Sequence, residues 1–161
     1  MDDKKVITHP VSFDQDLIGK KSINFSVPGE PFAKQRPRAA RKGSFITIYT
    51  PRETKNYEKK VEIEYNKIYR GQQLPGPLTV KVEGIFSVPS SASKKKQLEM
   101  LEGNIPHIKK PDCDNMAKVC LDALNGIAYS DDSIIDNLII SKKYGEKPMV
   151  RITIYQNKEG D

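Results

Sequence analysis

The chain has 161 residues, with 27 lysines and arginines against 21 aspartates and glutamates, for a formal net charge of +6. This length predicts one domain that buries a core without disulfides or structural metals. No run of about 20 apolar residues is present, which excludes a membrane-spanning helix, and the N-terminus lacks the apolar core of a secretory signal. We therefore expect a cytoplasmic protein whose basic charge favours nucleic acid or another anionic partner.

The first part of the chain predicts an arm followed by a strand. Residues 1–20 have mixed charge and poor periodicity, so we expect a flexible N-terminal arm before a single domain at residues 21–157. Ser22–Val27 alternates polar and apolar residues and ends at Pro28-Gly29. This pattern is typical of a strand that stops at a turn.

Segment 31–43 is strongly basic and contains no acidic residue. Its two prolines and its terminal glycine disfavour a helix, so it predicts a basic loop or hairpin. The next residues, Ser44–Tyr49, are rich in β-branched and aromatic side chains and predict a second strand. The cations that we expect to contact DNA phosphates in this segment are Lys34, Arg36, Arg38, Arg41 and Lys42.

A helix is predicted to begin at Pro51, with Thr50 as N-cap and Glu53 as its capping-box partner. Gly71 should end this helix. The residues that fall at helical spacing are Tyr57, Val61, Tyr65 and Ile68.

Leu78–Val88 is the clearest strand of the sequence and alternates until Gly84, where we expect a bulge. Ser91 or Ser93 is then placed to cap a short polar helix that runs through Leu101. Three consecutive lysines begin this helix and can extend a basic surface; they are Lys94, Lys95 and Lys96.

Asn115–Asn125 predicts a strongly amphipathic helix, with Gly126 in position to end it. Two further strands, Ile134–Ser141 and Val150–Tyr155, complete the domain. Strands outnumber helices and no βα repeat is visible, so we expect an α+β fold in two layers, with a mixed β-sheet packed against helices. The apolar stripe of the helix consists of Met116, Cys120, Ala123 and Leu124.

The two cysteines do not predict a disulfide or a zinc site. If Cys113 and Cys120 lie on one helix, their Cα atoms are about 10 Å apart, beyond the roughly 7 Å that a disulfide spans. No Cys-x-x-Cys or His-x-x-x-His pair is available to complete a zinc site. We expect free thiols in a reducing compartment, with Cys120 as a small core residue.

Acidic residues gather between positions 112 and 132 of this basic chain. Asp112 and Asp114 lie two apart in extended backbone just before a helix, so their side chains can converge on one cation. The pair Asp131-Asp132 follows the helix and precedes a strand. Each feature also has a purely structural explanation, because Asp114 can cap the helix and adjacent acids often occupy turns.

Asp114, Lys118 and Asp122 recur at every fourth position and form a polar stripe on the predicted helix. Alone, such a stripe is more often a solvated face with weak ion pairs. Its position between two acidic pairs favours a metal site instead. Mg²⁺ takes oxygen ligands and keeps several waters, so two or three carboxylates and a substrate phosphate suffice, with Lys118 as the cation beside the phosphate.

Several other motifs with similar residues are excluded by their surroundings. An EF-hand requires Asp or Asn and then Gly where Met116 and Ala117 stand. The Asp-x-Asp of a haloacid-dehalogenase phosphatase should follow a buried apolar strand, whereas a basic segment precedes this one. No phosphate-binding P-loop sequence is present, and neither His9 nor His107 has a visible nucleophile partner.

Three segments together resemble the RusA family of Holliday junction resolvases, and most closely the phage and prophage members of Gram-positive bacteria. They are Lys34-Gln-Arg-Pro-Arg38, the segment from Pro111 to Gly126 with the pattern P-D-x-D-N-x-x-K-x-x-x-D-A-L-N-G, and Asp131-Asp132. The resemblance covers residues 23–155. It implies a RusA-like fold and a homodimer that cuts four-way DNA junctions symmetrically in recombination and repair.

The resemblance also implies roles for individual residues. Asp112, Asp114 and Asp132 match the essential acidic residues that hold Mg²⁺ or Mn²⁺, and Lys118 matches an important lysine. Asp131 matches a neighbouring acid whose role is open. Lys109 and Lys110 add to the basic surface predicted to bind DNA, although each charge run alone is more often solvated surface.

The residues leave three classes of function open. The first is a Mg²⁺-dependent endodeoxyribonuclease acting on branched DNA. The second is a catalytically inactive module that binds DNA junctions and recruits recombination factors. The third is a small-molecule phosphohydrolase that uses the Asp-x-Asp pair, against which the basic segments argue.

Overall fold

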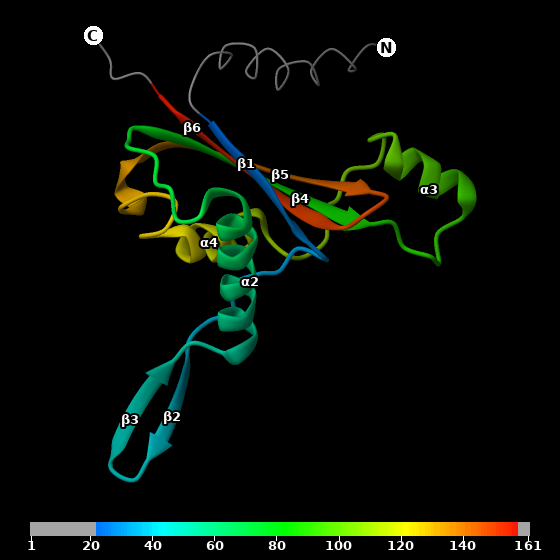
Figure 1. Cartoon of the computed structure of the whole chain (residues 1–161). Helices are drawn as coiled ribbons and strands as arrows, with labels where there is room; N and C mark the ends of the chain where they lie inside the picture. The colour runs from blue at the N-terminus through cyan, green and yellow to red at the C-terminus, as the bar shows by residue number, and fades with distance from the viewer. Residues whose placement is uncertain (1–21, 158–161) are drawn as a thin grey trace.

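The computed structural model describes residues 22–157, so the predicted N-terminal arm at residues 1–20 lies outside the described part of the chain. Four strands form a sheet in the order β1-β6-β4-β5 (Figure 1). β6 is antiparallel to both β1 and β4, whereas β5 is parallel to β4, which confirms the predicted mixed sheet. The strands are β1 (Ser22–Pro28), β4 (Leu78–Ser87), β5 (Ile135–Gly145) and β6 (Met149–Gln156).

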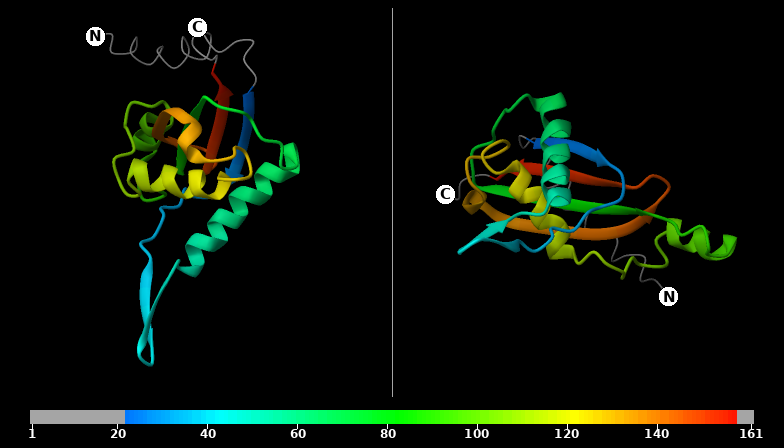
Figure 2. Two further views of the ribbon diagram at one scale, coloured as in Figure 1. Left: turned by 90° about the vertical axis from the view of Figure 1, so that its left-hand side faces the viewer. Right: turned by 90° about the horizontal axis from the view of Figure 1, so that it is seen from below.

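Two helices cover one face of this sheet, the lower face in Figure 1, and they also contact each other. They are α2 (Arg52–Tyr69) and α4 (Cys113–Leu124), and Figure 2 shows both in front of the sheet when the molecule is seen from below. α3 (Lys94–Leu101) lies beyond the end of β4, and the short 3₁₀ helix η2 (Asp132–Ile134) leads into β5. The α+β fold expected from the order of elements is thus confirmed.

The hydrophobic core lies between the sheet and these two helices, because alternation along each strand turns its apolar residues to the same face. On α4, the predicted stripe of Met116, Cys120, Ala123 and Leu124 is buried. On α2, the buried stripe ends at Tyr65, and Ile68 is 59% exposed. The strand residues of the core include Ile23, Phe25, Val27, Val80, Val82, Val150, Ile152 and Ile154.

The helix boundaries differ from the prediction where a cap was assumed. α2 begins at Arg52 with Pro51 at the N-cap, so a Thr50 cap with Glu53 as its partner is wrong. α4 begins at Cys113, two residues earlier than predicted, and Asp112 rather than Asp114 occupies the N-cap. Asp114 instead lies in the first helical turn, where the positive end of the helix dipole favours a carboxylate.

Two other expectations have clear outcomes. Ser93 caps α3, because its Oγ accepts a hydrogen bond from the Lys96 N–H at 3.3 Å. The bulge predicted at Gly84 is wrong, since the pairing of β4 with β5 and β6 runs through it without a shift. A Cβ atom at Gly84 would stand 2.4 Å from Sδ of Met116, so the glycine permits α4 to approach β4 closely.

The basic segment forms a hairpin that projects away from the rest of the molecule (Figure 1). β2 (Arg38–Lys42) pairs with β3 (Phe45–Tyr49), and every residue of both strands is exposed. Gly43 occupies the first position of the two-residue turn with φ of +64°, a conformation that this kind of tight hairpin turn requires. We call this element the β2–β3 hairpin. None of the helices in residues 22–157 is long and apolar enough to cross a membrane.

Candidate functional site

An open pocket of about 230 Å³ lies between α4, η2 and β5 and gathers the predicted polar residues. Asp114, Lys118 and Asp122 line it from successive turns of α4, and Asp132 lines it from η2. The polar stripe of α4 therefore faces a shared pocket rather than open solvent alone. We call it the α4 pocket; its remaining lining residues are Ala117, Leu121, Leu138 and Ile140.

Elementary helix geometry places these side chains. Residues four apart in a helix lie on one face, so the buried stripe headed by Met116 leaves Asp114, Lys118 and Asp122 on a different side of α4. β5 then runs beside α4 and contacts it. This return of the chain brings Asp132 to the same pocket as Asp114, which spacing alone made plausible but did not establish.

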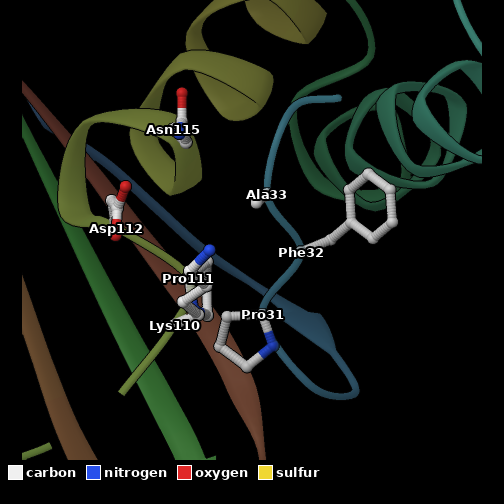
Figure 3. Close-up of a pocket in the computed structure, with 7 residues that line it drawn as sticks. All are labelled: Pro31, Phe32, Ala33, Lys110, Pro111, Asp112 and Asn115. Carbon is white, nitrogen blue, oxygen red and sulfur yellow. The ribbon is translucent and has the colours of Figure 1, made fainter. Parts of the chain in front are cut away.

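Asp112 faces a second, neighbouring pocket of about 440 Å³ at the start of α4. Figure 3 shows its carboxylate near Asn115, with Pro111 and Pro31 below. The structure thus brings Asp114 and Asp132 to one pocket and Asp112 to the next one. Within residues 22–157, no three His, Cys, Asp or Glu side chains are close enough together to form a ready-made metal site.

Asp122 is already neutralised within the protein. The ammonium of Lys34 forms an ion pair with Asp122 and lies 3.9 Å from Oε1 of Glu58, and all three side chains are about three-quarters buried. Burial raises the pKa of Glu58, Lys34 lowers it and Asp122 raises it. Asp114 and Asp132, both exposed, are therefore the carboxylates of the α4 pocket that remain for a ligand.

Lys34 consequently differs from the other residues predicted to bind DNA, because its charge faces two carboxylates of its own chain. Its backbone N–H also donates to the carbonyl of Asn115 at 3.1 Å, which joins the base of the β2–β3 hairpin to α4. Sequence reasoning missed these contacts because the partners are far apart along the chain. The other predicted DNA contacts are exposed: Arg36, Arg38, Arg41, Lys42 and Lys110.

The adjacent acids Asp131 and Asp132 have different roles. Asp131 caps η2, because its carboxylate accepts hydrogen bonds from both the N–H and the hydroxyl of Ser133. These bonds lower the pKa of Asp131. Asp132 lines the α4 pocket, so the capped turn positions the second acid of the pair.

Lys142 is a positioning residue that sequence reasoning missed. Its ammonium donates to the carbonyls of Lys109 at 2.6 Å and Pro111 at 2.8 Å, and so holds the loop that leads into Asp112. The sequence itself marks Lys142 as unusual. In the alternation of β5 it occupies the same face as Ile140 and Tyr144, where an apolar residue that points toward the core is expected.

His107 packs at the start of the same loop. Its ring stacks on Phe86 with centroids 3.7 Å apart and meets Tyr144 edge-on. Burial, with a smaller contribution from Lys142, lowers the pKa of His107 and favours its neutral form. Its aromatic contacts give His107 a structural role at the start of this loop.

Comparison with known proteins agrees with the resemblance found in the sequence. The model of the family described as endodeoxyribonuclease RusA matches residues 28–155, which include the β2–β3 hairpin, α4 and η2. The chain is also 34% identical over 134 residues to the uncharacterized protein YqaN of Bacillus subtilis strain 168. That alignment covers 82% of this chain and 94% of YqaN.

Proposed function

Since the chain belongs to the RusA family of endodeoxyribonucleases, we propose that it resolves Holliday junctions by metal-dependent hydrolysis of phosphodiester bonds, in DNA recombination and repair. The observation that carries this proposal is the α4 pocket, where Asp114 and Asp132 lie beside Lys118 although they come from different elements. Carboxylates and one amine at an open pocket suit a phosphodiester better than an apolar substrate.

Asp114 and Asp132 of the α4 pocket, together with Asp112 of the neighbouring pocket, would hold Mg²⁺, for which Mn²⁺ could substitute. The donor set fits this ion, because Mg²⁺ is usually held by one or two carboxylates together with waters and substrate phosphate. Asp112 sits at the N-cap of α4 without a side-chain capping bond, so its carboxylate is not committed to the helix. When bound, the ion lowers the pKa of a bound water and offsets charge on the scissile phosphate.

The lysines around the site have separate roles. Lys118 lies one turn beyond Asp114 and faces the α4 pocket, where its ammonium stabilises the charge that develops on the phosphate. Lys34 neutralises Asp122, which lowers the repulsion that an additional carboxylate would exert on an incoming phosphate. Lys142 holds the loop before Asp112, so that the carboxylate is presented from a fixed backbone.

DNA approaches across the exposed cations of the β2–β3 hairpin and the loop before α4. Arg36, Arg38, Arg41 and Lys42 neutralise phosphates of the junction, and Lys110 contacts the backbone next to the site. The protein acts as a homodimer, because resolution of a four-way junction needs paired incisions and a two-fold dimer supplies two related sites.

The proposal is tested by mapping nicks on a synthetic mobile four-way junction, with Mg²⁺, with Mn²⁺ and with chelator. We expect symmetric nicks with either metal and none with chelator. Asp112→Asn and Asp114→Asn should slow cleavage roughly 100- to 1000-fold at unchanged junction affinity. Glu146→Gln makes the same chemical change on an exposed residue just beyond the far end of β5 and should have no effect.

Two results would refute parts of the proposal. If both aspartate variants cut at the wild-type rate while binding DNA equally well, the metal assignment is wrong. Tight junction binding by the wild-type protein without cleavage in either metal would instead identify a binding module that recruits recombination factors.

A further inference from the structure

The β2–β3 hairpin exposes large apolar side chains as well as cations. Phe45 is 78% exposed, Ile46 72% and Ile48 73%, and Tyr49 is also exposed. A two-stranded hairpin without a third strand or a helix over it is only marginally stable in water. Exposed apolar side chains on a projecting element mark a surface that meets a partner.

Strand pairing sorts these side chains onto two different faces. Residues directly opposite each other in an antiparallel pair point to the same side. Phe45 therefore shares a face with Lys42, its partner at the turn, and Tyr49 shares that face with Arg38. We call these four residues the cationic-aromatic face; the opposite face carries Ala39, Arg41, Ile46 and Ile48.

The charge around the hairpin identifies its partner as a polyanion. No acidic residue occurs between Glu30 and Glu53, so two copies of the hairpin packed together would bring only like charges into contact. DNA offers the complementary charge and, in its bases, flat apolar surfaces for aromatic rings. The cations of the segment are Lys34, Arg36, Arg38, Arg41, Lys42 and Arg52.

The position of Phe45 indicates that the hairpin binds DNA where a base face is exposed. Phe45 adjoins the turn, at the tip that lies farthest from the sheet (Figure 1). In an intact duplex each base is covered by its neighbours, so a ring at the tip finds no free base surface. In the open form of a junction, stacking is interrupted where the arms meet, so base faces become available there. An aromatic side chain can stack on such a base face.

The base of the hairpin is attached to the helix that bears the site. Lys34 N–H donates to the carbonyl of Asn115 on α4, and Gln35 N–H donates to Oγ1 of Thr54 on α2 at 3.3 Å. Asn115 immediately follows Asp114 of the α4 pocket. When the tip of the β2–β3 hairpin binds one point of the DNA, these contacts therefore orient α4 relative to that point.

We propose that the β2–β3 hairpin recognises the branch point of DNA, with Phe45 stacked on an exposed base and with Arg38 and Lys42 on the converging phosphates. This inference rests on the proposed function, since it assigns the origin of structure selectivity to a named element. Stacking does not depend on base identity, so the hairpin distinguishes branched from linear DNA whatever the sequence at the branch.

The test compares affinities for a four-way junction and for a linear duplex of matched length, in chelator so that cleavage does not interfere. Phe45→Ala should weaken junction binding about tenfold and leave duplex binding unchanged. Phe45→Leu should behave like Phe45→Ala, because it keeps apolar area without a ring, and Phe45→Trp should preserve selectivity. Ile48→Ala, on the opposite face and similarly exposed, is the matched control and should leave both affinities unchanged.

The outcomes separate this inference from the proposed nuclease function. If Phe45→Ala and Phe45→Leu keep wild-type selectivity while the wild-type protein cuts junctions, the hairpin inference is wrong and the nuclease proposal stands. If the Phe45 or Ile48 variants change the molecular mass measured by sedimentation in the absence of DNA, the hairpin is a self-association arm instead. A wild-type protein that shows the expected selectivity but never cuts supports the hairpin role and refutes the nuclease.

Discussion

α4 and the β2–β3 hairpin both carry charged residues on which the proposed function depends, yet the two elements are held in opposite ways. α4 buries Met116, Cys120 and Leu124 completely and offers its polar stripe to a pocket, so its functional groups stand on the hydrophobic core. The hairpin buries none of its strand residues. The residues proposed to act in cleavage, which need fixed geometry, thus lie on a helix packed against the core. The residues proposed to bind DNA lie on a projecting hairpin instead.

The largest expected effect tests whether this difference is real in solution. Met116→Ala should lower the free energy of unfolding by about 3 kcal/mol, because it removes a fully buried side chain that packs against Gly84 of β4. Ile48→Ala in the hairpin should change it by less than about 0.5 kcal/mol. Urea denaturation measures both, and a comparable loss at Ile48 would mean that the hairpin is packed against something.

The next effect concerns how each region contributes to DNA binding. Replacing Arg38, Arg41 and Lys42 by alanine should weaken binding to any DNA and reduce the slope of log affinity against log salt by about 2 to 3. The matched control replaces the three lysines of α3, which lies apart from the hairpin (Figure 1). An equal change of slope in the control would show that total charge, and not the hairpin, attracts DNA. The control residues are Lys94, Lys95 and Lys96.

A smaller effect is expected at Lys142, which supports the site without facing the α4 pocket. Lys142→Met removes the donor to the carbonyls of Lys109 and Pro111, so the loop before Asp112 loosens. We expect cleavage to slow about tenfold at saturating DNA with unchanged affinity, and Lys142→Arg to restore much of the rate. Lys143→Met, on the opposite sheet face, serves as control, and a loss of affinity without loss of rate would assign Lys142 to DNA binding instead.

Sequence reasoning succeeded where a local pattern decides the structure. The amphipathic stripe of α4, the Ser93 cap and the alternating strands could be predicted because neighbouring residues determine them. The stripe Asp114-Lys118-Asp122 was predicted as a unit for the same reason. The prediction from sequence was wrong at Gly84, because the glycine there permits the close approach of Met116 from another element.

Contacts between distant segments limited what could be predicted about the site. The ion pair between Lys34 and Asp122 depends on how α2, α4 and the base of the hairpin pack together. The residues next to Lys34 and Asp122 in the sequence do not predict it. The same holds for the placement of Asp112 in a different pocket from Asp132. Lys142 is an intermediate case, since the broken alternation of β5 was visible but its partners were not.

The smallest expected effect concerns the reactivity of the two cysteines, which lie on the exposed and the buried sides of α4. Cys113 is exposed at the first turn, whereas Cys120 is fully buried and its burial raises the thiol pKa to about 12. Because the raised pKa favours the protonated form, Cys120 stays an unreactive thiol from pH 7 to well above pH 9. A thiol reagent at pH 8 should therefore label one cysteine per folded chain and two after denaturation. Labelling Cys113 should leave the unfolding free energy unchanged within about 0.5 kcal/mol, whereas rapid labelling of both would show that the buried side of α4 opens readily.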